Sequence, residues 1–266
     1  ILMFDISEEE YTAAIEAPVF TCLNHESSWL TKFDYALCRD KLSELVLMAV
    51  KTQKSENTIE QNLNSLLDSF YSDFAFSGTS QKVPMSLLNS VAYALNYRTG
   101  STISLGMILT YVMEQLGFDV EMLVFENDIQ VLLEVSQGEG YLIDPCSGGQ
   151  RWYIKPENDD ENSLDNAFQQ LFEDDVVKLF LAHQKWAFIS EKRYGEAFKC
   201  VEKLMVLTDG DPYELRDRGY LLHNLNCDEL AIKDFEKFIE ECPDDPSIDV
   251  LQSQIEEMDS HFRTIH

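Results

Sequence analysis

Residues 98–117, RTGSTISLGMILTYVMEQLG, decide the fold of this chain. The segment 98–104 is polar and has the composition of a turn that leads into a helix N-terminus. Residues 105–116 are mostly apolar, which predicts a helix that is buried on most of its sides. Gly117 is a typical residue just past a helix end. We therefore expect a central buried helix with the rest of its domain packed around it.

Three short apolar segments follow this helix, at residues 119–125, 129–135 and 140–143. Their length and their content of Val, Leu, Ile, Phe and Tyr are typical of strands, and the polar residues and glycines between them are typical of tight turns. The order predicts an antiparallel meander that packs against the central helix. Residues 145–149, which include a proline and two glycines, close it.

The region before the central helix reads as mainly helical. Residues 41–51 and 58–70 each carry apolar side chains at helical spacing, which predicts two helices with one face in the core. Residues 72–84 are rich in Ser, Thr and Gly and read as a loop, and residues 85–95 resume the helical pattern.

The last third of the chain contains a repeat. Pro212 and Pro246 lie 34 residues apart, as do Ala197 and Ala231. Thirty-four residues is the tetratricopeptide period, a helix–turn–helix unit that buries its apolar face by stacking on neighbours. Two repeats are fewer than the three usually needed, so we expect the first domain and a final helix at 247–258 to cap them. Coincidental spacing between two helical hairpins is the alternative, and it leaves the helical architecture unchanged.

These patterns predict an α+β fold that is mostly α. We divide the chain into residues 1–155, a helical region plus a core with a small antiparallel sheet, and 176–266, a tetratricopeptide-like helical domain. Residues 156–175 contain eight acidic residues and no Lys or Arg, and they read as an acidic linker. Apolar residues within it at 164, 167, 168, 171 and 172 predict a short amphipathic helix.

The charge of the chain limits its partners. Forty-eight acidic residues against twenty Lys and Arg give a net charge of −28. Nucleic-acid binding requires clustered Lys and Arg to contact phosphates, and the sequence has no such cluster, so we expect no direct DNA or RNA binding. The acidic surface fits either simple solubility by self-repulsion or a basic protein partner.

The cysteines and the hydropathy pattern limit the location and the cofactors. The six cysteines are scattered without a C-x-x-C pair or a histidine at zinc spacing. We therefore expect buried thiols in a reducing compartment, for which the cytoplasm fits best. We expect no metal or other cofactor. No apolar run reaches the ~18 residues of a membrane-spanning helix, and we expect no membrane partner.

The turn before the central helix is the place where chemistry is expected. A helix N-terminus stabilises negative charge, so it suits a thiolate nucleophile or a bound anion. The strands that follow, and the sequence Tyr141-Leu-Ile-Asp-Pro145 after them, could supply a base and an orienting acid. A nucleophile, a base and an acid in this order would form a Cys-His-Asp arrangement.

The order Arg98-x-Gly-x-x-x-Ser-Leu, helix, strand, turn, strand and Leu-Ile-Asp-Pro resembles the transglutaminase-like core. It is most similar to a bacterial family, of the invasion-regulator Sir-B type, in which this core is followed by tetratricopeptide repeats. Ser86-Leu-Leu-Asn89 and the tail sequence DPYELRDRG at 211–219 agree with that family. The resemblance covers roughly residues 30–260 and implies both the fold and a site at the head of the central helix.

The chain departs from this family where the chemistry belongs. The resemblance implies a cysteine in the turn, where this chain has Ser101, Thr102 and Ser104, and a histidine where it has Asp128. Asp144, in the place of the orienting acid, is retained. A hydroxyl is a weak nucleophile without a base to accept its proton, and a carboxylate is a poor proton acceptor near neutral pH. These five residues are therefore vestigial-site candidates, with no residue assigned as catalytic.

Structural roles compete with any role in catalysis at these positions. Ser104 and Thr102 are ordinary helix-capping residues, and Asp144 before a proline is a good turn-former. A replacement base could come from His183 or His25, if either folds over the site.

Two functional hypotheses follow. The first is a non-catalytic protein-interaction or regulatory protein, in which the tetratricopeptide-like tail or the acidic face binds a protein partner, possibly a basic one. The alternative is a residual amide hydrolase or acyl-transfer enzyme with Ser or Thr in place of cysteine. A pocket for a small molecule or an anion at residues 100–104 is a third reading.

Overall fold

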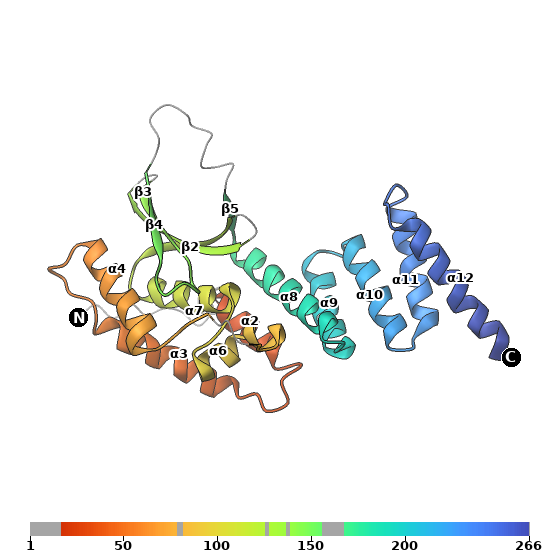
Figure 1. The fold of residues 1–266 in the computed structure, drawn as a ribbon, viewed down its shortest axis with the longest axis horizontal. Helices are drawn as coiled ribbons and strands as arrows, with labels where there is room; N and C mark the ends of the chain where they lie inside the picture. The colour runs from red at the N-terminus through yellow and green to blue at the C-terminus, as the bar shows by residue number, and fades with distance from the viewer. Residues whose placement is uncertain (1–16, 79–81, 126–127, 137–138, 156–167, 266) are drawn as a thin grey trace, which may run out of the picture.

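The computed structural model describes residues 17–78, 82–125, 128–136, 139–155 and 168–265. The chain has an α+β fold that is mostly α, with one small antiparallel sheet. Figure 1 shows a sheet that lies on a layer of helices, and a row of helices that extends away from this core toward the C-terminus. In the parts of the chain that the structure describes, no helix is long and apolar enough to cross a membrane.

The helices before the sheet lie largely where the sequence pattern predicts them, and Thr58 begins one of them with a capping box. The apolar stripe at 41–51 belongs to a longer helix, and the segment 85–95 is divided at Asn89 and Ser90. The elements are α2 (Pro18–Glu26), α3 (Tyr35–Val50), α4 (Ile59–Asp68), the π-helix η1 (Ser69–Asp73), α5 (Met85–Leu88), α6 (Val91–Tyr97) and α7 (Thr102–Gln115).

The sheet has five antiparallel strands in the order β4-β3-β2-β1-β5. The three predicted strands are confirmed as neighbours, with register pairs such as Met122 with Val131 and Leu132 with Leu142. The sequence pattern missed the two outer strands. The strands are β1 (Asp119–Phe125), β2 (Asp128–Ser136), β3 (Glu139–Ile143), β4 (Arg151–Ile154) and β5 (Phe168–Leu171).

The prediction of a short helix within residues 156–175 is wrong for the part of this segment that the structure describes. Phe168–Leu171 forms strand β5, which pairs with β1 through Met122 and Leu171. The remaining residues of that expected helix, 164–167, lie outside the described residues. Apolar positions three and four apart predicted a helix, but the free edge of β1 offers backbone hydrogen bonds that a four-residue segment can use.

Helix α7 is the centre of the core. Ile103, Leu105, Ile108, Leu109 and Val112 are fully buried, and the helix contacts α3 and α6 as well as β1 and β2. Figure 1 shows α7 directly below the sheet. Gly106 permits this close approach, because a Cβ atom there would lie 3.2 Å from Cε of Met122 on β1. The predicted central buried helix is thus confirmed.

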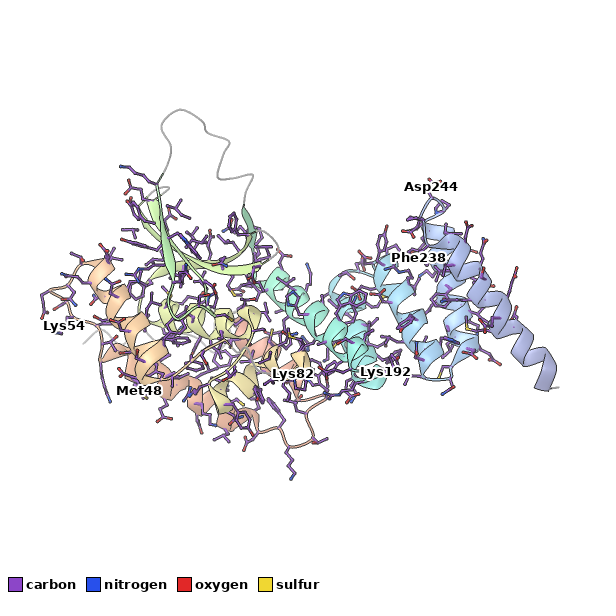
Figure 2. All side chains as sticks on the ribbon, viewed as in Figure 1. Met48, Lys54, Lys82, Lys192, Phe238 and Asp244 are labelled. Carbon is purple, nitrogen blue, oxygen red and sulfur yellow. The ribbon has the colours of Figure 1, made fainter. Side chains whose placement is uncertain are left out.

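A row of helices forms the C-terminal part. It contains two helical pairs and a final helix: α8 (Glu173–Ser190) with α9 (Tyr194–Leu207), α10 (Pro212–Asn224) with α11 (Asp228–Glu241), and α12 (Ile248–Ile265). The first pair shares the main apolar core, where Trp29, in the turn after α2, packs against Phe180 and Phe188 of α8. The second pair has its own cluster with α12, around Phe235 and Phe238; Phe238 is labelled in Figure 2.

The tail sequence DPYELRDRG at 211–219 holds neighbouring helices together. Lys185 of α8 is buried and forms ion pairs with Glu214 at 2.8 Å and Asp217 at 2.7 Å. Arg218 binds Asp234 of α11 with two hydrogen bonds, at 2.7 and 2.8 Å. Charged groups buried to this extent are stable only when they are paired. This part of the resemblance therefore reflects packing between the repeats.

Glu26 is a buried carboxylate that joins two helices. Its two oxygens accept hydrogen bonds from the backbone N–H groups of Val91, at 2.7 Å, and Ala92, at 3.0 Å, so it caps α6 from α2. Burial raises the pKa of Glu26 to about 7, although these N–H donors oppose the rise. The start of α6 is thereby fixed by a side chain 65 residues earlier in the chain.

We expect the contribution of Glu26 to stability to fall with rising pH. The folded protein keeps a proton on Glu26 that the unfolded chain releases between its ordinary pKa of 4.5 and about 7. The contribution is complete below pH 4.5 and decreases by on the order of 3 kcal/mol as the pH rises to 7. Urea unfolding at several pH values should show the advantage of the parent over Glu26→Gln shrinking across this range.

The matched control for this experiment is Glu229→Gln, which removes an exposed carboxylate from α11. Its difference from the parent should change little between pH 4.5 and 7. A pH-independent difference for Glu26→Gln would contradict the raised pKa.

Candidate functional site

The site expected from the sequence lies at the N-terminus of α7, and Ser104 is part of its framework. Ser104 is 0% exposed, and its Oγ donates a hydrogen bond to the Leu88 carbonyl oxygen at 2.7 Å. It also accepts the backbone N–H of Ser101 at 3.1 Å, and that same N–H donates to Leu88 O at 2.9 Å. The Ser104 proton is thus directed at a carbonyl oxygen, so Ser104 ties the start of α7 to the end of α5.

The other two hydroxyl candidates lie one turn earlier. Ser101 is the N-cap residue of α7 and Thr102 is its first helical residue, and both are half-buried. Among the residues that the structure describes, neither hydroxyl forms a hydrogen bond with Asp128 or Asp144. These hydroxyls therefore have no carboxylate bonded to them that could accept their proton.

Asp144 organises the loop that contains it. One carboxylate oxygen accepts the backbone N–H of Cys146 at 2.8 Å, and the other accepts the hydroxyl of Ser147. The loop is fixed further by Tyr71, whose hydroxyl donates to Pro145 O at 3.0 Å. These bonds occupy both oxygens of Asp144, and they are those of a turn-forming aspartate.

Cys146 is a thiol-bearing residue at this site that the sequence pattern did not identify. Its Sγ lies 3.7 Å from the carbonyl oxygen of Gly100, so its thiol reaches the head of α7 from the loop after β3. Its sequence signal is its position directly after the Asp144-Pro145 pair, outside the turn in which the resemblance implies a cysteine. Tertiary folding therefore brings a thiol next to the turn where the sequence has hydroxyls.

The surroundings of Cys146 disfavour a thiolate. Burial first, and then the negative charges of Asp144 and Asp128, raise the pKa of the thiol to about 12. The thiolate is the nucleophilic form of cysteine, and a thiol with this pKa is almost entirely protonated at neutral pH. The carboxylates of Asp144 and Asp128 thus disfavour a thiolate at this position.

The structure brings one histidine into electrostatic range of the site. Burial lowers the pKa of His183 on α8, while the carboxylate of Asp128 opposes the shift. Asp128 itself is exposed at the start of β2, and its Oδ1 accepts the N–H of Ile129 at 2.9 Å. His25 lies near Lys203 instead; burial first, and then that lysine, lower its pKa to about 4.

In the described residues, the arrangement has two carboxylates, those of Asp128 and Asp144, and no nucleophile hydrogen-bonded to a base. Across the described part of the chain, no cysteine, serine or threonine side chain at the head of α7 is hydrogen-bonded to an imidazole. The described residues also contain no group of three or more His, Cys, Asp and Glu side chains that could hold a metal ion.

The chain belongs to the transglutaminase-like superfamily, whose family model matches residues 36–177. This match covers the sheet, α7 and the helices around it. Residues 184–256 match a tetratricopeptide repeat family, which confirms the interpretation of the 34-residue period.

Relatives that align with most of this chain occur in several bacteria. A UPF0162 protein of Vibrio cholerae serotype O1 is 26% identical over 260 residues, which cover 95% of this chain and 96% of the relative. Protein SirB1 of Salmonella typhimurium is 28% identical over 240 residues and 85% of each chain. UPF0162 protein YchA of Escherichia coli strain K12 is 27% identical over 242 residues, 85% of this chain and 87% of the relative.

Replacing Ser104 should lower stability. Ser104→Ala removes the buried hydrogen bond to Leu88 O and one acceptor of the Ser101 N–H, and we expect a loss of about 1–2 kcal/mol in the free energy of unfolding. Thr102→Ala, at a half-buried position without such a bond, should change it by less than about 0.5 kcal/mol. Denaturant unfolding of both variants tests this, and equal effects would contradict a structural role specific to Ser104.

Cys146 should react slowly with thiol reagents. At pH 7.5 we expect alkylation by iodoacetamide to be at least about tenfold slower at Cys146 than at the exposed Cys227, because little of the Cys146 thiol is ionised. Timed labelling with peptide mass spectrometry measures both rates. Asp128→Asn should accelerate labelling of Cys146 alone; equal rates at Cys146 and Cys227 in the parent would contradict the raised pKa.

Proposed function

We propose that this protein is a non-catalytic protein-interaction protein, built on a degenerate transglutaminase-like core with a tetratricopeptide tail. On this proposal Ser101, Thr102, Ser104, Asp128 and Asp144 mark a vestigial site. The support is that the Ser104 hydroxyl is used for structure and both oxygens of Asp144 hold a loop.

A groove on the tail carries the proposal. A cavity of about 330 Å³ lies between α8, α10 and α12, and all of its lining residues belong to the segment 186–254. The core domain therefore does not line it. Trp186, Tyr220 and Val250 contribute one side chain from each helix and are 55%, 39% and 59% exposed. Exposed apolar side chains gathered in one groove are typical of protein-binding surfaces.

The groove has the position expected for a peptide site in stacked helical repeats. Helices α8 and α10 are the first helices of the two pairs, and α12 continues the same row. Such rows form the extended binding surface of repeat proteins. Trp and Tyr are the residue types that most often supply binding energy at protein interfaces. A helix or extended peptide with apolar side chains would fit these anchors.

Charge favours a basic partner. The net charge of −28 attracts positively charged proteins and raises their association rates. A regulatory role would act through this partner, because the chain lacks the Lys and Arg clusters of nucleic-acid binding. The free cysteines of the described chain fit a reducing compartment, and we place the protein in the cytoplasm.

A residual amide hydrolase or acyl-transfer enzyme has less support. Its serine would need a base within hydrogen-bond reach, whereas Ser104 donates to a carbonyl oxygen. His183 is the only one of the two candidate histidines whose pKa responds to a site carboxylate.

The proposal is tested by affinity capture from a lysate of the source organism with the full chain and point variants. Truncation at residue 176 is unsuitable, since Phe180 and Phe188 belong to the core. We expect Trp186→Ala to reduce recovery of a reproducible partner at least fivefold. Trp152→Ala removes a tryptophan of similar exposure from β4 and should leave recovery unchanged.

Equal recovery with Trp186→Ala and Trp152→Ala would contradict the groove as the binding surface. Circular dichroism should show that both variants fold, so that a loss of binding reports on the surface.

A further inference from the structure

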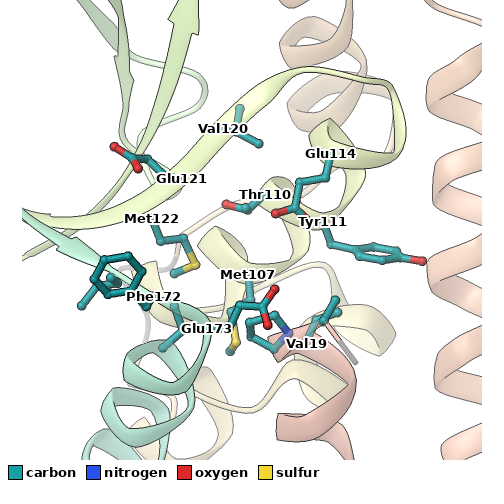
Figure 3. A pocket seen from close by; sticks show the side chains of 14 residues that line it. Val19, Met107, Thr110, Tyr111, Glu114, Val120, Glu121, Met122, Phe172 and Glu173 are labelled. Atoms are coloured by element: carbon teal, nitrogen blue, oxygen red, sulfur yellow. The ribbon is translucent and has the colours of Figure 1, made fainter. Parts of the chain in front are cut away.

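A second cavity, of about 210 Å³, lies between the last two turns of α7, strand β1 and the start of α8 (Figure 3). Met107, Thr110 and Met122 form its buried side, whereas Phe172 at its mouth is 67% exposed. Thr110 and Glu114 lie nine and thirteen positions after Ser101, about 14 and 20 Å along the axis of α7. The polar side of the cavity is thus separate from the vestigial site at the head of α7, and the cavity shares no lining residue with the groove on the tail.

Three glutamates line this cavity, and two of them, Glu114 and Glu173, face its interior. Glu114 lies in the last turn of α7, where the helix dipole disfavours negative charge. Burial raises the pKa of Glu114, and the neighbouring carboxylate of Glu173 raises it further. In the described ranges neither carboxylate forms an ion pair. Burial raises the pKa of Tyr111, which lines the cavity, and the positive charge of Arg39 opposes this rise. The guanidinium group of Arg39 stacks on the rings of Phe20 and Tyr35 and forms no ion pair with Glu114 or Glu173 in the described residues.

Thr110 supplies an independent observation. It is 8% exposed, and its Oγ1 is buried without a hydrogen-bond partner among the described residues. Thr110 lies one helical turn before Glu114, so both side chains are on the same face of α7. Figure 3 shows the Thr110 hydroxyl and the carboxylates of Glu114 and Glu173 around the same space, whereas Glu121 points away from it. Glu121 is hydrogen-bonded to Gln170.

A buried polar atom without a partner is costly unless a ligand or water satisfies it. Here the polar atoms are acceptors: two carboxylates and a hydroxyl oxygen, which can also accept. Among the described residues that line the cavity, none is Lys, Arg or His. The remaining walls are apolar side chains, including Met107, Met122 and Leu171. A matching ligand therefore combines several N–H donors and a positive charge with an apolar stem.

We propose that this cavity binds a primary alkylammonium group. Its three N–H donors match the Thr110 hydroxyl, Glu114 and Glu173, and its alkyl stem would contact Met107 and Met122. A quaternary ammonium carries the same charge but has no N–H, so it would leave Thr110 without a partner. A free alkylamine and a lysine side chain of another polypeptide present the same chemistry, and the test separates them.

The binding test uses the full chain with ¹³C-methyl-labelled methionine, because Met107 and Met122 line the cavity. NMR titrations with n-butylammonium, tetramethylammonium and n-butanol compare charge and N–H donors at matched ionic strength. We expect n-butylammonium to shift these two methyl signals and to bind at least tenfold more tightly than either of the other two. Equal binding of tetramethylammonium, or no shift with n-butylammonium, would overturn the proposal.

Variants separate the site from general acidity. Glu114→Gln and the isosteric Thr110→Val should each weaken n-butylammonium binding at least fivefold, while Glu229→Gln, which removes a remote exposed charge, should change it less than twofold. A loss with Glu229→Gln as large as that with Glu114→Gln would show diffuse surface attraction and overturn the site. The methyl spectra also report whether each variant remains folded.

The source of the ammonium group is tested with a capped lysine peptide, acetyl-Gly-Lys-Gly-amide, in the same titration. Tighter binding of this peptide than of n-butylammonium supports the cavity as a site for a lysine side chain of a polypeptide. Weaker binding of the peptide supports a free alkylamine. Failure of both ligands to bind would overturn the proposal, and it would leave the proposed groove on the tail unaffected.

Discussion

The hydrogen bond from Ser104 Oγ to the carbonyl oxygen of Leu88 is the contact on which the core depends. It fixes the start of α7, whose buried side chains touch the sheet on one side and α3 and α6 on the other. Glu26 fixes the start of α6 in the same way. Both helix starts are inside the protein, where free N–H and C=O groups must find partners. The order of the core therefore rests on polar groups placed at helix ends.

The same constraint accounts for two residues at the site that the sequence predicted. Ser104 at the head of α7 and Asp144 in the loop after β3 each hold the backbone through hydrogen bonds of their own. A thiol reaches the site from Cys146, but burial and two carboxylates keep it protonated. In the described residues, the polar groups of this site hold the backbone, and no imidazole is hydrogen-bonded to a hydroxyl or thiol there.

The tail is attached to the core through its first helical pair, so only its outer surface is free. Phe180 and Phe188 of α8 pack against Trp29, while Trp186 on the same helix is exposed to the groove. One helix thus serves as both the cap of the core and one wall of the groove. Two repeats suffice because the core supplies the neighbour that a third repeat would otherwise provide.

The sequence by itself determined the order of elements, the buried central helix, the three middle strands and the repeat, because each leaves a local pattern of apolar residues or a fixed period. It also showed that the turn lacks cysteine. Only the tertiary structure decided that 168–171 is a strand, that Cys146 reaches Gly100, and that Thr110 and Glu114 share a cavity with Glu173. These features depend on contacts between distant segments, whose packing and hydrogen bonds outweigh local preference and leave no periodic signal.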